Sequence, residues 1–381
     1  MALVPEIVKK FVGQGVDVVV QAGAGSAATF EDDAYVEAGA RIAPDVAATV
    51  GAADVVVKVN APTAAEVAAY KDGVLVLSFL QISQSTEALA ALAAKGGTAV
   101  SFDLLPRISR AQSMDALSSQ SLVSGYRSGL AAAEALSKFF PMFMTAAGTV
   151  PPARVLVMGV GVAGLQAIAT AKRLGANVLA YDVRAAAKEE AESLGAKFLD
   201  LGVSAEGTGG YARELTAEEL AAQQAALAKE IAGVDVVITT AAVPGRKAPI
   251  LVTTAMVESM GPGSVIVDMA ADGGGNVECT VAGETVVKNH CRVIGLSNPP
   301  ASMPTHASFL FARNVANLLE LFTNEGSLDP DWADEIVIGT TVLRAGAAAN
   351  AAAAEALGLA HQPIEVPAPP ADESNEETSA S

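Results

Sequence analysis

Residues 154–184 read RVLVMGVGVAGLQAIATAKRLGANVLAYDVR. An apolar β-rich run is followed by Gly159, Gly161 and Gly164 in the spacing G-x-G-x-x-G, then by a helical stretch and a second β-rich run that ends at Asp182. The three glycines permit a tight turn, a close approach of pyrophosphate to the backbone, and close packing of the helix on the sheet. The free N–H groups at the helix N-terminus favour phosphate. The segment therefore predicts a strand–turn–helix–strand unit that binds a dinucleotide.

The acid at the end of this unit predicts which dinucleotide is bound. A carboxylate at Asp182 can accept hydrogen bonds from the adenosine ribose hydroxyls and would repel a 2′-phosphate. We therefore predict NAD(H) as the cofactor of this chain. Arg184 follows two residues later, where it could hold a phosphate or be an ordinary surface arginine.

On both sides of this unit, β-rich runs alternate with helical stretches, which is typical of parallel strands joined by crossover helices. Long helical patterns at 118–140 and 306–322 separate two such series. A last run at 335–342 looks like a strand that returns to the first series. The other expected strands lie at 16–21, 53–59, 74–80, 98–104, 154–158, 177–181, 197–201, 235–239, 264–269 and 292–296.

These patterns predict an α/β fold with two Rossmann-like doubly wound parallel-sheet domains, the first discontinuous, linked by long helices. The first domain is expected to comprise residues 1–117 and 305–345, and the NAD-binding domain residues 118–304. Beyond these the chain is rich in alanine and then in proline and acids. Such a composition buries little apolar surface, so residues 346–381 are expected to form a flexible tail.

Charge and composition exclude several classes of protein. The 381 residues include 24 Lys+Arg and 42 Asp+Glu, for a net charge of −18. This argues against a nucleic-acid binder and against attraction to anionic lipid, because both need a basic surface. No apolar run approaches the roughly 20 residues of a membrane-spanning helix, so no direct membrane insertion is expected. The two cysteines, Cys279 and Cys291, fit a reducing cytoplasm, and no metal site is predicted.

A second polar motif, RISRAQSMDALSS, begins at Arg107, between the last strand of the first series and the long helix. It has two interpretations. Its charged and amide side chains lie at a domain junction, where ligands commonly bind. Alternatively, it is a polar loop that caps the helix, with Ser113 or Asp115 near the N-cap.

Several stretches together resemble the NAD(H)-binding alpha subunit of proton-translocating NAD(P) transhydrogenases, within a wider family that includes alanine dehydrogenase. The likeness extends from about Leu3 to Val342. It implies a Re/Si-specific enzyme that transfers hydride directly between NAD(H) and the NADP(H) of a partner subunit, coupled to proton translocation. The stretches are RISRAQSMDALSSQS, MTAAGTVPPARVLVMGVGVAGLQAIATAKRLGA, GAKFLDL, GGYARE and ITTAAVPGR, which begin at residues 107, 144, 195, 209 and 238.

The same resemblance implies roles for individual residues. It places Arg107 near the nicotinamide carboxamide and Gln112 towards the ribose of the partner nucleotide, with Asp115 and Ser118 beside them as the catalytic group. Loop 209–214 matches a mobile flap that closes over the site. The expected cofactor-binding residues are Gln112, Ser113, Met114, Asp115, Gly159, Gly161, Val162, Ala163, Gly164, Asp182, Val183, Arg184, Gly210, Tyr211, Gln224 and Ala242.

Partners and location also follow from the resemblance. It implies membrane-spanning transhydrogenase subunits that include an NADP(H)-binding domain, and a second copy of the chain in a homodimer. The chain would be cytoplasmic, peripheral on the cytoplasmic face of the inner (plasma) membrane through those subunits.

The scarcity of histidine bears on the chemistry. The chain has three, at 290, 306 and 361, and none lies in the first series. Oxidation of an alcohol or amine usually needs a base such as His or Lys, yet Gln81 and Asn60 stand where alanine dehydrogenases carry a catalytic His and a substrate-binding Lys. Hydride transfer between two nicotinamides needs only positioning. A soluble NAD-dependent enzyme of the alanine dehydrogenase type is the alternative, and a non-catalytic NAD-sensing module is a third hypothesis.

Overall fold

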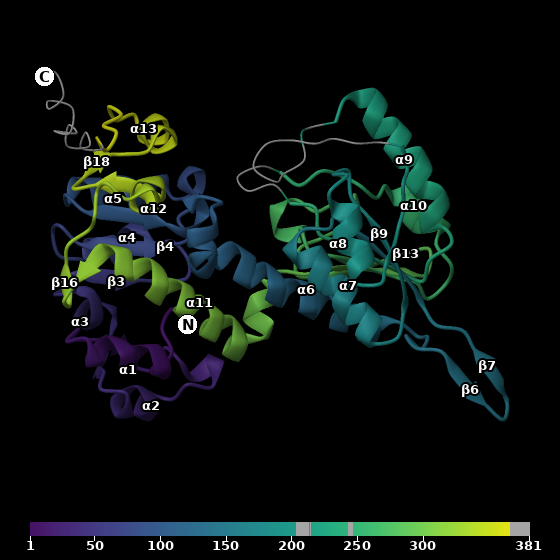
Figure 1. Ribbon diagram of the computed structural model, residues 1–381, viewed down its shortest axis with the longest axis horizontal. Coiled ribbons are helices and arrows are strands. Elements are labelled where there is room, and N and C mark those ends of the chain that lie inside the picture. Colours follow the sequence, from purple (N-terminus) through teal and green to yellow (C-terminus); the bar gives the residue numbers. More distant parts are fainter. Residues whose placement is uncertain (203–212, 214, 243–246, 366–381) are drawn as a thin grey trace, which may run out of the picture.

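The computed structural model describes residues 1–202, 213, 215–242 and 247–365 of the chain. Two α/β lobes lie side by side (Figure 1). Helix α6 (Ala116–Ala135) leads from the first lobe into the second, and α11 (Pro304–Leu319) leads back. The two helices contact each other, so the crossing points of the chain form one connection between the lobes.

The lobe that follows α6 is built on a seven-stranded sheet with the order β10-β9-β8-β11-β12-β14-β13. Numbered from β8 and leaving out β13, its strands lie in the order 3-2-1-4-5-6, which is that of the doubly wound dinucleotide-binding fold. All neighbouring strands are parallel except β13 and β14. The strands are β8 (Arg154–Met158), β9 (Asn177–Tyr181), β10 (Lys197–Phe198), β11 (Val236–Thr239), β12 (Val265–Asp268), β13 (Thr285–Lys288) and β14 (Cys291–Gly295).

Helices cover both faces of this sheet, so its central strands are apolar throughout. On β8, Val155 and Val157 pack in one core with Ala167 of α7, while Leu156 packs in the opposite core with Leu227 of α9. The helices of this lobe are α7 (Val162–Arg173), α8 (Ala187–Ser193), α9 (Ala217–Ile231) and α10 (Thr254–Ser259).

The first lobe contains a five-stranded sheet with the order β18-β17-β5-β4-β3 and a separate parallel pair, β1 (Val19–Gln21) with β2 (Arg41–Ala43). Strands β3, β4 and β5 are parallel, and β17 joins them antiparallel. The larger sheet comprises β3 (Val55–Val57), β4 (Leu75–Ser78), β5 (Thr98–Ser101), β17 (Thr341–Arg344) and β18 (Ala347–Ala348), and the helices are α1 (Pro5–Gly13), α2 (Asp32–Glu37), α3 (Val46–Val50), α4 (Ala64–Ala68), α5 (Thr86–Ala94), α12 (Glu335–Thr340) and α13 (Ala351–Leu357).

The prediction of a strand over residues 335–342 is wrong for most of its length. Helix α12 occupies Glu335–Thr340, and only then does β17 begin. The Asp334 carboxylate accepts hydrogen bonds from the backbone N–H groups of Ile336 and Val337, and this N-cap fixes a helical turn in a β-branched sequence. The segment still returns to the first lobe, because β17 pairs with β5.

The flexible tail expected from residue 346 starts later than predicted. Strand β18 pairs with β17, and α13 packs its fully buried Ala353 into the core of the first lobe. Asn350 caps α13 through the N–H groups of Ala352 and Ala353. A capped helix with small side chains can approach its neighbours closely, so alanine buries enough surface here. Residues 366–381 lie outside the described part of the chain.

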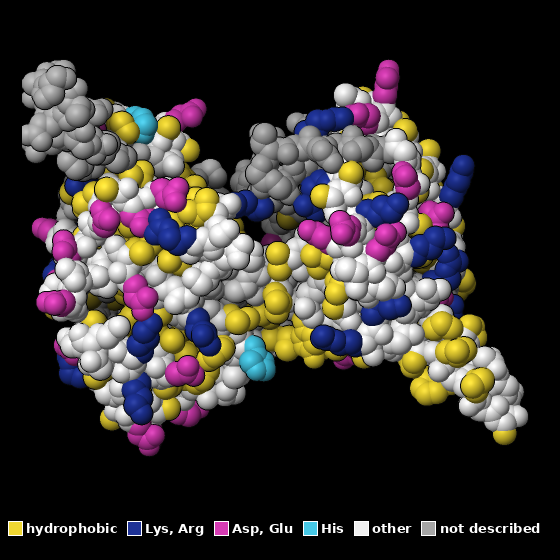
Figure 2. Space-filling model, in the orientation of Figure 1, with side chains coloured by type: hydrophobic (Ala, Val, Ile, Leu, Met, Phe, Trp, Pro, Cys, Tyr) yellow, Lys and Arg dark blue, Asp and Glu magenta, His cyan; other side chains and the backbone are white. Residues whose placement is uncertain are grey.

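An antiparallel hairpin that the sequence patterns did not indicate follows α6. Its strands are β6 (Phe143–Thr145) and β7 (Gly148–Val150), and it projects from the second lobe (Figure 1). Apolar side chains gather on it (Figure 2); Met144 is 80% exposed. In the described residues, no helix is long and apolar enough to cross a membrane.

Candidate functional site

The glycine turn between β8 and α7 is shaped by two close backbone approaches. Gly159 has a φ of 92°, which favours glycine. A Cβ atom on Gly164 would lie 1.8 Å from the Gly159 carbonyl oxygen, and the Thr240 hydroxyl donates to that oxygen at 2.8 Å. By contrast, a Cβ atom on Gly161 would meet nothing within 4 Å. Gly159 and Gly164 are thus needed for the turn itself, whereas Gly161 faces open space at the N-terminus of α7.

Asp182 lies directly after β9 beside this turn, and its side chain is 8% exposed. Its carboxylate accepts the Val160 backbone N–H at 2.7 Å, so it is tied to the glycine turn. Arg184 donates to both carboxylate oxygens, from Nε at 3.0 Å and from Nη2 at 2.9 Å. This pairing raises the pKa of the Arg184 guanidinium. The acid and its guanidinium partner form one charged unit at the edge of the turn, and Val183 between them is half-buried.

The structure brings the RISRAQSMD segment to the glycine turn. Residues Ser109–Met114 form a 3₁₀ helix, η4, just before α6. Gln112 and Ser113 of this helix line a hollow of about 400 Å³ together with Val162, the first residue of α7. The full lining is Gln112, Ser113, Asp115, Ser118, Ser119, Leu122, Val162, Leu310, Arg313, Asn314 and Asn317.

The helix-cap interpretation of this segment is right for one residue. Asp115 is the N-cap of α6, and its carboxylate accepts the Ser118 N–H at 2.8 Å and the Ser118 hydroxyl at 2.5 Å. Met114 is buried and packs in the core of the first lobe, away from the hollow. Arg107 is exposed before η4 and is not among the residues that line the hollow.

The remaining expected contacts lie beyond the ends of β9 and β11. Gln224 is half-buried on α9, Ala242 is exposed after β11, and Ala163 is buried in α7. Gly210 and Tyr211 lie outside the described residues, as does most of the flap expected at 209–214.

Sequence reasoning missed the contribution of α11. Its residues Leu310, Arg313, Asn314 and Asn317 line the hollow, at the i, i+3, i+4, i+7 spacing of one helix face. That spacing is visible in the sequence, but nothing local indicates that this face meets a loop about 200 positions earlier.

Sequence reasoning also missed a buried amide–carboxylate pair behind Ala241. The Asn276 side chain accepts the Ala241 N–H and donates to the Ala241 carbonyl. Asp268, fully buried, accepts the backbone N–H of Asn276 at 2.9 Å and the Thr239 hydroxyl at 3.1 Å. Because buried polar groups so paired are costly to rearrange, the pair fixes the loop after β11 that leads to Ala242.

Acid–base groups are few around the hollow. None of the described lining residues is a histidine or a lysine, and the one lining carboxylate, Asp115, already serves as a helix cap. Gln81 donates its backbone N–H to Asp103 beside β4, and Lys58 is ion-paired with Glu66 at 2.5 Å. Across the described residues, no group of three or more His, Cys, Asp or Glu side chains could hold a metal ion.

Family models match both lobes. The model described as alanine dehydrogenase/PNT, N-terminal domain, matches residues 1–124, and that of the C-terminal domain matches residues 128–351. The chain is 48% identical over 358 residues to the first of the two chains of NAD(P) transhydrogenase subunit alpha from Rhodospirillum rubrum, with 91% of this chain and 93% of that protein covered. Alanine dehydrogenase of Bacillus subtilis is 28% identical, with 91% and 86% covered.

Solved structures show the same ranking. The transhydrogenase from Sinorhizobium meliloti superposes with a TM-score of 0.80 at 43% identity and covers 92% of this chain and 95% of its own. An L-alanine dehydrogenase superposes with a TM-score of 0.77 at 24% identity, covering 94% and 95%, and so shows the shared fold.

Proposed function

Because the chain belongs to the alanine dehydrogenase/PNT family, we propose that it is the NAD(H)-binding subunit of a proton-translocating NAD(P) transhydrogenase. It transfers hydride directly between its own NAD(H) and NADP(H) held by a partner subunit. The higher identity to transhydrogenase alpha subunits than to alanine dehydrogenase supports this choice within the family. The transfer is Re/Si-specific and coupled to proton movement in the membrane subunits.

The composition of the hollow carries the proposal. An alanine dehydrogenase must accept a proton when it oxidises an amine, yet its described lining offers no histidine or lysine and one carboxylate that is already a helix cap. Exchange between two nicotinamides moves a hydride and leaves no proton to be accepted, so positioning alone can drive it. The Lys58–Glu66 ion pair also leaves this lysine occupied rather than presented to a substrate carboxylate.

The described residues fit NAD(H) in one orientation. The open space at Gly161 and the N-terminus of α7 suit the pyrophosphate, and Asp182 with Val183 and Arg184 suits the adenosine ribose. Gln224 and Ala242 flank the nucleotide on either side. The nicotinamide then lies towards Gln112 and Ser113, where NAD(H) supplies the hydride donor or acceptor.

Near the reacting ring, we assign Gln112 to contact both nucleotides and Asp115 with Ser118 to shape the floor beneath the ring. Their support is the shared hollow and the 2.8 Å N-cap bond. Arg107 approaches the carboxamide, a role that requires its exposed side chain to turn towards the hollow.

The proposed assembly places membrane-spanning subunits and an NADP(H)-binding domain against this chain at the cytoplasmic face of the inner membrane. It also contains a second copy of the chain. The hairpin β6–β7 supports the homodimer, because it exposes large apolar side chains that water disfavours. These are Phe139, Met142, Phe143, Met144 and Val150 (Figure 2).

The test mixes the purified chain with an NADP-binding transhydrogenase partner and follows reduction of an NAD analogue by NADPH in the presence of NADH. We expect exchange that requires both proteins. Alanine-dependent NADH formation by the chain alone would instead establish the alanine dehydrogenase alternative. NADH binding without exchange, with a partner that is active with an authentic alpha subunit, would establish a non-catalytic sensor.

A further inference from the structure

The 3₁₀ helix η4, which carries Gln112 and Ser113 to the hollow, belongs to neither sheet. Its buried residues Ala111 and Met114 pack in the core of the first lobe, while Gln112 and Ser113 are exposed. Packing of two small contacts leaves the pitch of so short a helix weakly determined. What fixes the direction of Gln112 must therefore come from polar contacts.

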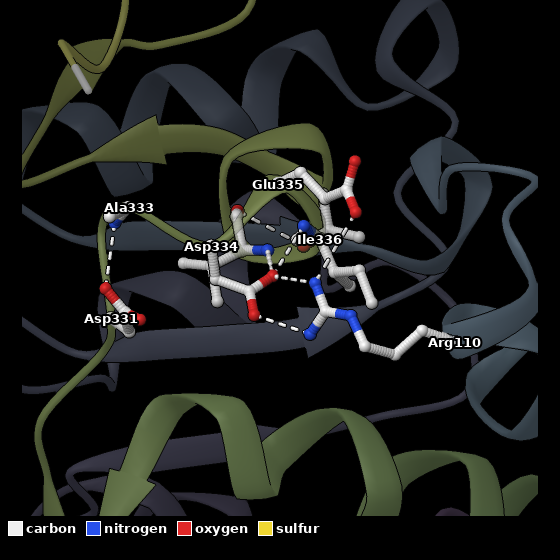
Figure 3. Close-up of polar contacts among 8 residues, drawn as sticks. Arg110, Asp331, Ala333, Asp334, Glu335 and Ile336 are labelled. Carbon is white, nitrogen blue, oxygen red and sulfur yellow. Dashed lines mark hydrogen bonds and ion pairs between the residues drawn. The ribbon is translucent and has the colours of Figure 1, made fainter. Parts of the chain in front are cut away.

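One such contact joins η4 to the N-cap of α12, 224 residues later in the chain. The Arg110 guanidinium donates from Nη1 to Asp334 Oδ2 at 2.6 Å and from Nη2 to Asp334 Oδ1 at 2.9 Å. Glu335 lies 3.7 Å from the same guanidinium. Figure 3 shows the planar fork meeting the carboxylate face to face. Two parallel bonds fix the orientation of a side chain as well as its distance.

Asp334 is itself held rigidly. Its side chain is 13% exposed, and its Oδ1 also accepts the Ile336 N–H at 2.7 Å as the N-cap of α12. Ile336 and Val337 are buried in the same core as Ala111 and Met114. The carboxylate is thus anchored to the core beneath η4, and the hydrogen bonds from Arg110 hold the pKa of Asp334 below its usual value.

The other end of η4 is held by α11. The side-chain amides of Asn314 and Asn317 each donate to the Ser113 carbonyl at 2.9 Å. Asn314 is 7% exposed, and its Oδ1 accepts the Ser119 hydroxyl of α6 at 2.7 Å. Both ends of the short helix are therefore fixed by the segment that returns from the second lobe.

We propose that Arg110 is a positioning residue for hydride transfer: with Asp334 it forms a clasp that sets the orientation of η4 and hence of Gln112. The proposal rests on the function proposed above. The clasp is not needed for global stability, since the Arg110 side chain is 49% exposed and such pairs contribute little. A bidentate pair at the loop that meets the nicotinamide affects geometry instead, and a displacement of about 1 Å can cost about a hundredfold in rate.

The test uses the full chain with its NADP-binding partner and three variants. Arg110→Gln removes the fork, Arg110→Lys keeps the charge without the fork, and Asp334→Asn keeps the N-cap, because an amide oxygen still accepts the α12 N–H groups. Arg41→Gln is the matched control, since Arg41 forms a similar two-bond contact with Asp17 on the exposed surface. The readouts are the exchange rate, the Kd for NADH and the Tm.

We expect Arg110→Gln and Asp334→Asn each to slow exchange by about tenfold or more, with the Kd for NADH changed by less than about threefold. The double variant should be no slower than the slower single one, because both break the same clasp. Arg110→Lys should recover part of the rate, and Arg41→Gln should match wild type.

Three outcomes would overturn the clasp: wild-type rates in both single variants, additive losses in the double variant, or rate losses matched by equal losses of NADH affinity. If wild type shows no exchange with its partner, the proposed function fails separately. Hydrogen exchange at residues 109–114 then still decides the clasp, with faster exchange in Arg110→Gln than in Arg41→Gln supporting it and equal exchange refuting it.

Discussion

Substitution of two glycines in one turn should have opposite consequences. Gly161→Ala adds a methyl group where nothing lies within 4 Å, at a φ of −82° that alanine adopts without strain. Gly164→Ala places its methyl 1.8 Å from the Gly159 carbonyl oxygen and must displace α7 from the sheet. We therefore expect Gly161→Ala to keep the unfolding free energy within about 1 kcal/mol of wild type. Gly164→Ala should lose about 1–3 kcal/mol or more through overpacking.

The ligand reverses the comparison, because the space at Gly161 is where the pyrophosphate would lie. A ligand at one hundred times its Kd stabilises by about 2.7 kcal/mol. With an unfolding entropy of about 2.1 cal/mol/K per residue, 381 residues convert this to a rise in Tm of about 3 °C. If the Gly161 methyl weakens NADH a hundredfold, the same NADH concentration stabilises by only about 0.4 kcal/mol, and the rise falls to about 0.5 °C.

Thermal melts with and without NADH, supported by NADH fluorescence titration, measure both effects. The expected pattern is a normal Tm without NADH and a lost NADH shift for Gly161→Ala, against a lowered Tm without NADH for Gly164→Ala. A wild-type NADH shift in Gly161→Ala would refute the placement of the pyrophosphate. It would also reduce the role of the motif to turn formation.

Three further predictions concern charge and assembly. Asp182→Asn should narrow the preference for NADH over NADPH by about tenfold, because the repelling charge is lost and Arg184 is released; equal preferences in fluorescence titrations of variant and wild type would contradict this. Asp334 has a lowered pKa from its hydrogen bonds to Arg110, so its stabilisation is present above its ordinary pKa and lost as the pH falls through the lower value. The Tm difference between wild type and Asp334→Asn should therefore shrink from about pH 6 to about pH 3, and a constant difference would argue against it. Met144→Asp, at an exposed hairpin position, should weaken the proposed dimer without lowering the Tm of the monomer, as sedimentation velocity can show; Val287→Asp, on the exposed edge strand β13, is the control.

The region of the fold that covers the adenosine half could be predicted from the sequence because its signals are local. Strands β8 and β9 begin and end at the predicted residues, since apolar runs covered on both faces leave a strong pattern. The α/β class, its parallel Rossmann-like sheets and the transhydrogenase resemblance are confirmed.

The elements that escaped prediction have weak or misleading local patterns. Hairpin β6–β7 lies away from both cores, so no burial periodicity marks it. Helix α12 has the β-branched sequence EIVIGT, and its helical state depends on the Asp334 cap and on packing in the core. In such short segments tertiary contacts override intrinsic propensity.

The two halves of the proposed site therefore differ in how the sequence encodes them. The adenosine half lies within 31 consecutive residues, so turn, helix and acid specify one another through neighbouring contacts. The nicotinamide half depends on the return of α11 and α12 to the first lobe, where Asn314 and Asp334 hold a loop about 200 positions earlier. A motif can indicate that the nucleotide binds, but only the tertiary fold determines how the loop faces the reacting ring. Substitutions in 304–340 should accordingly alter hydride transfer while leaving the affinity for the adenosine half intact, which is the separation that the clasp variants measure.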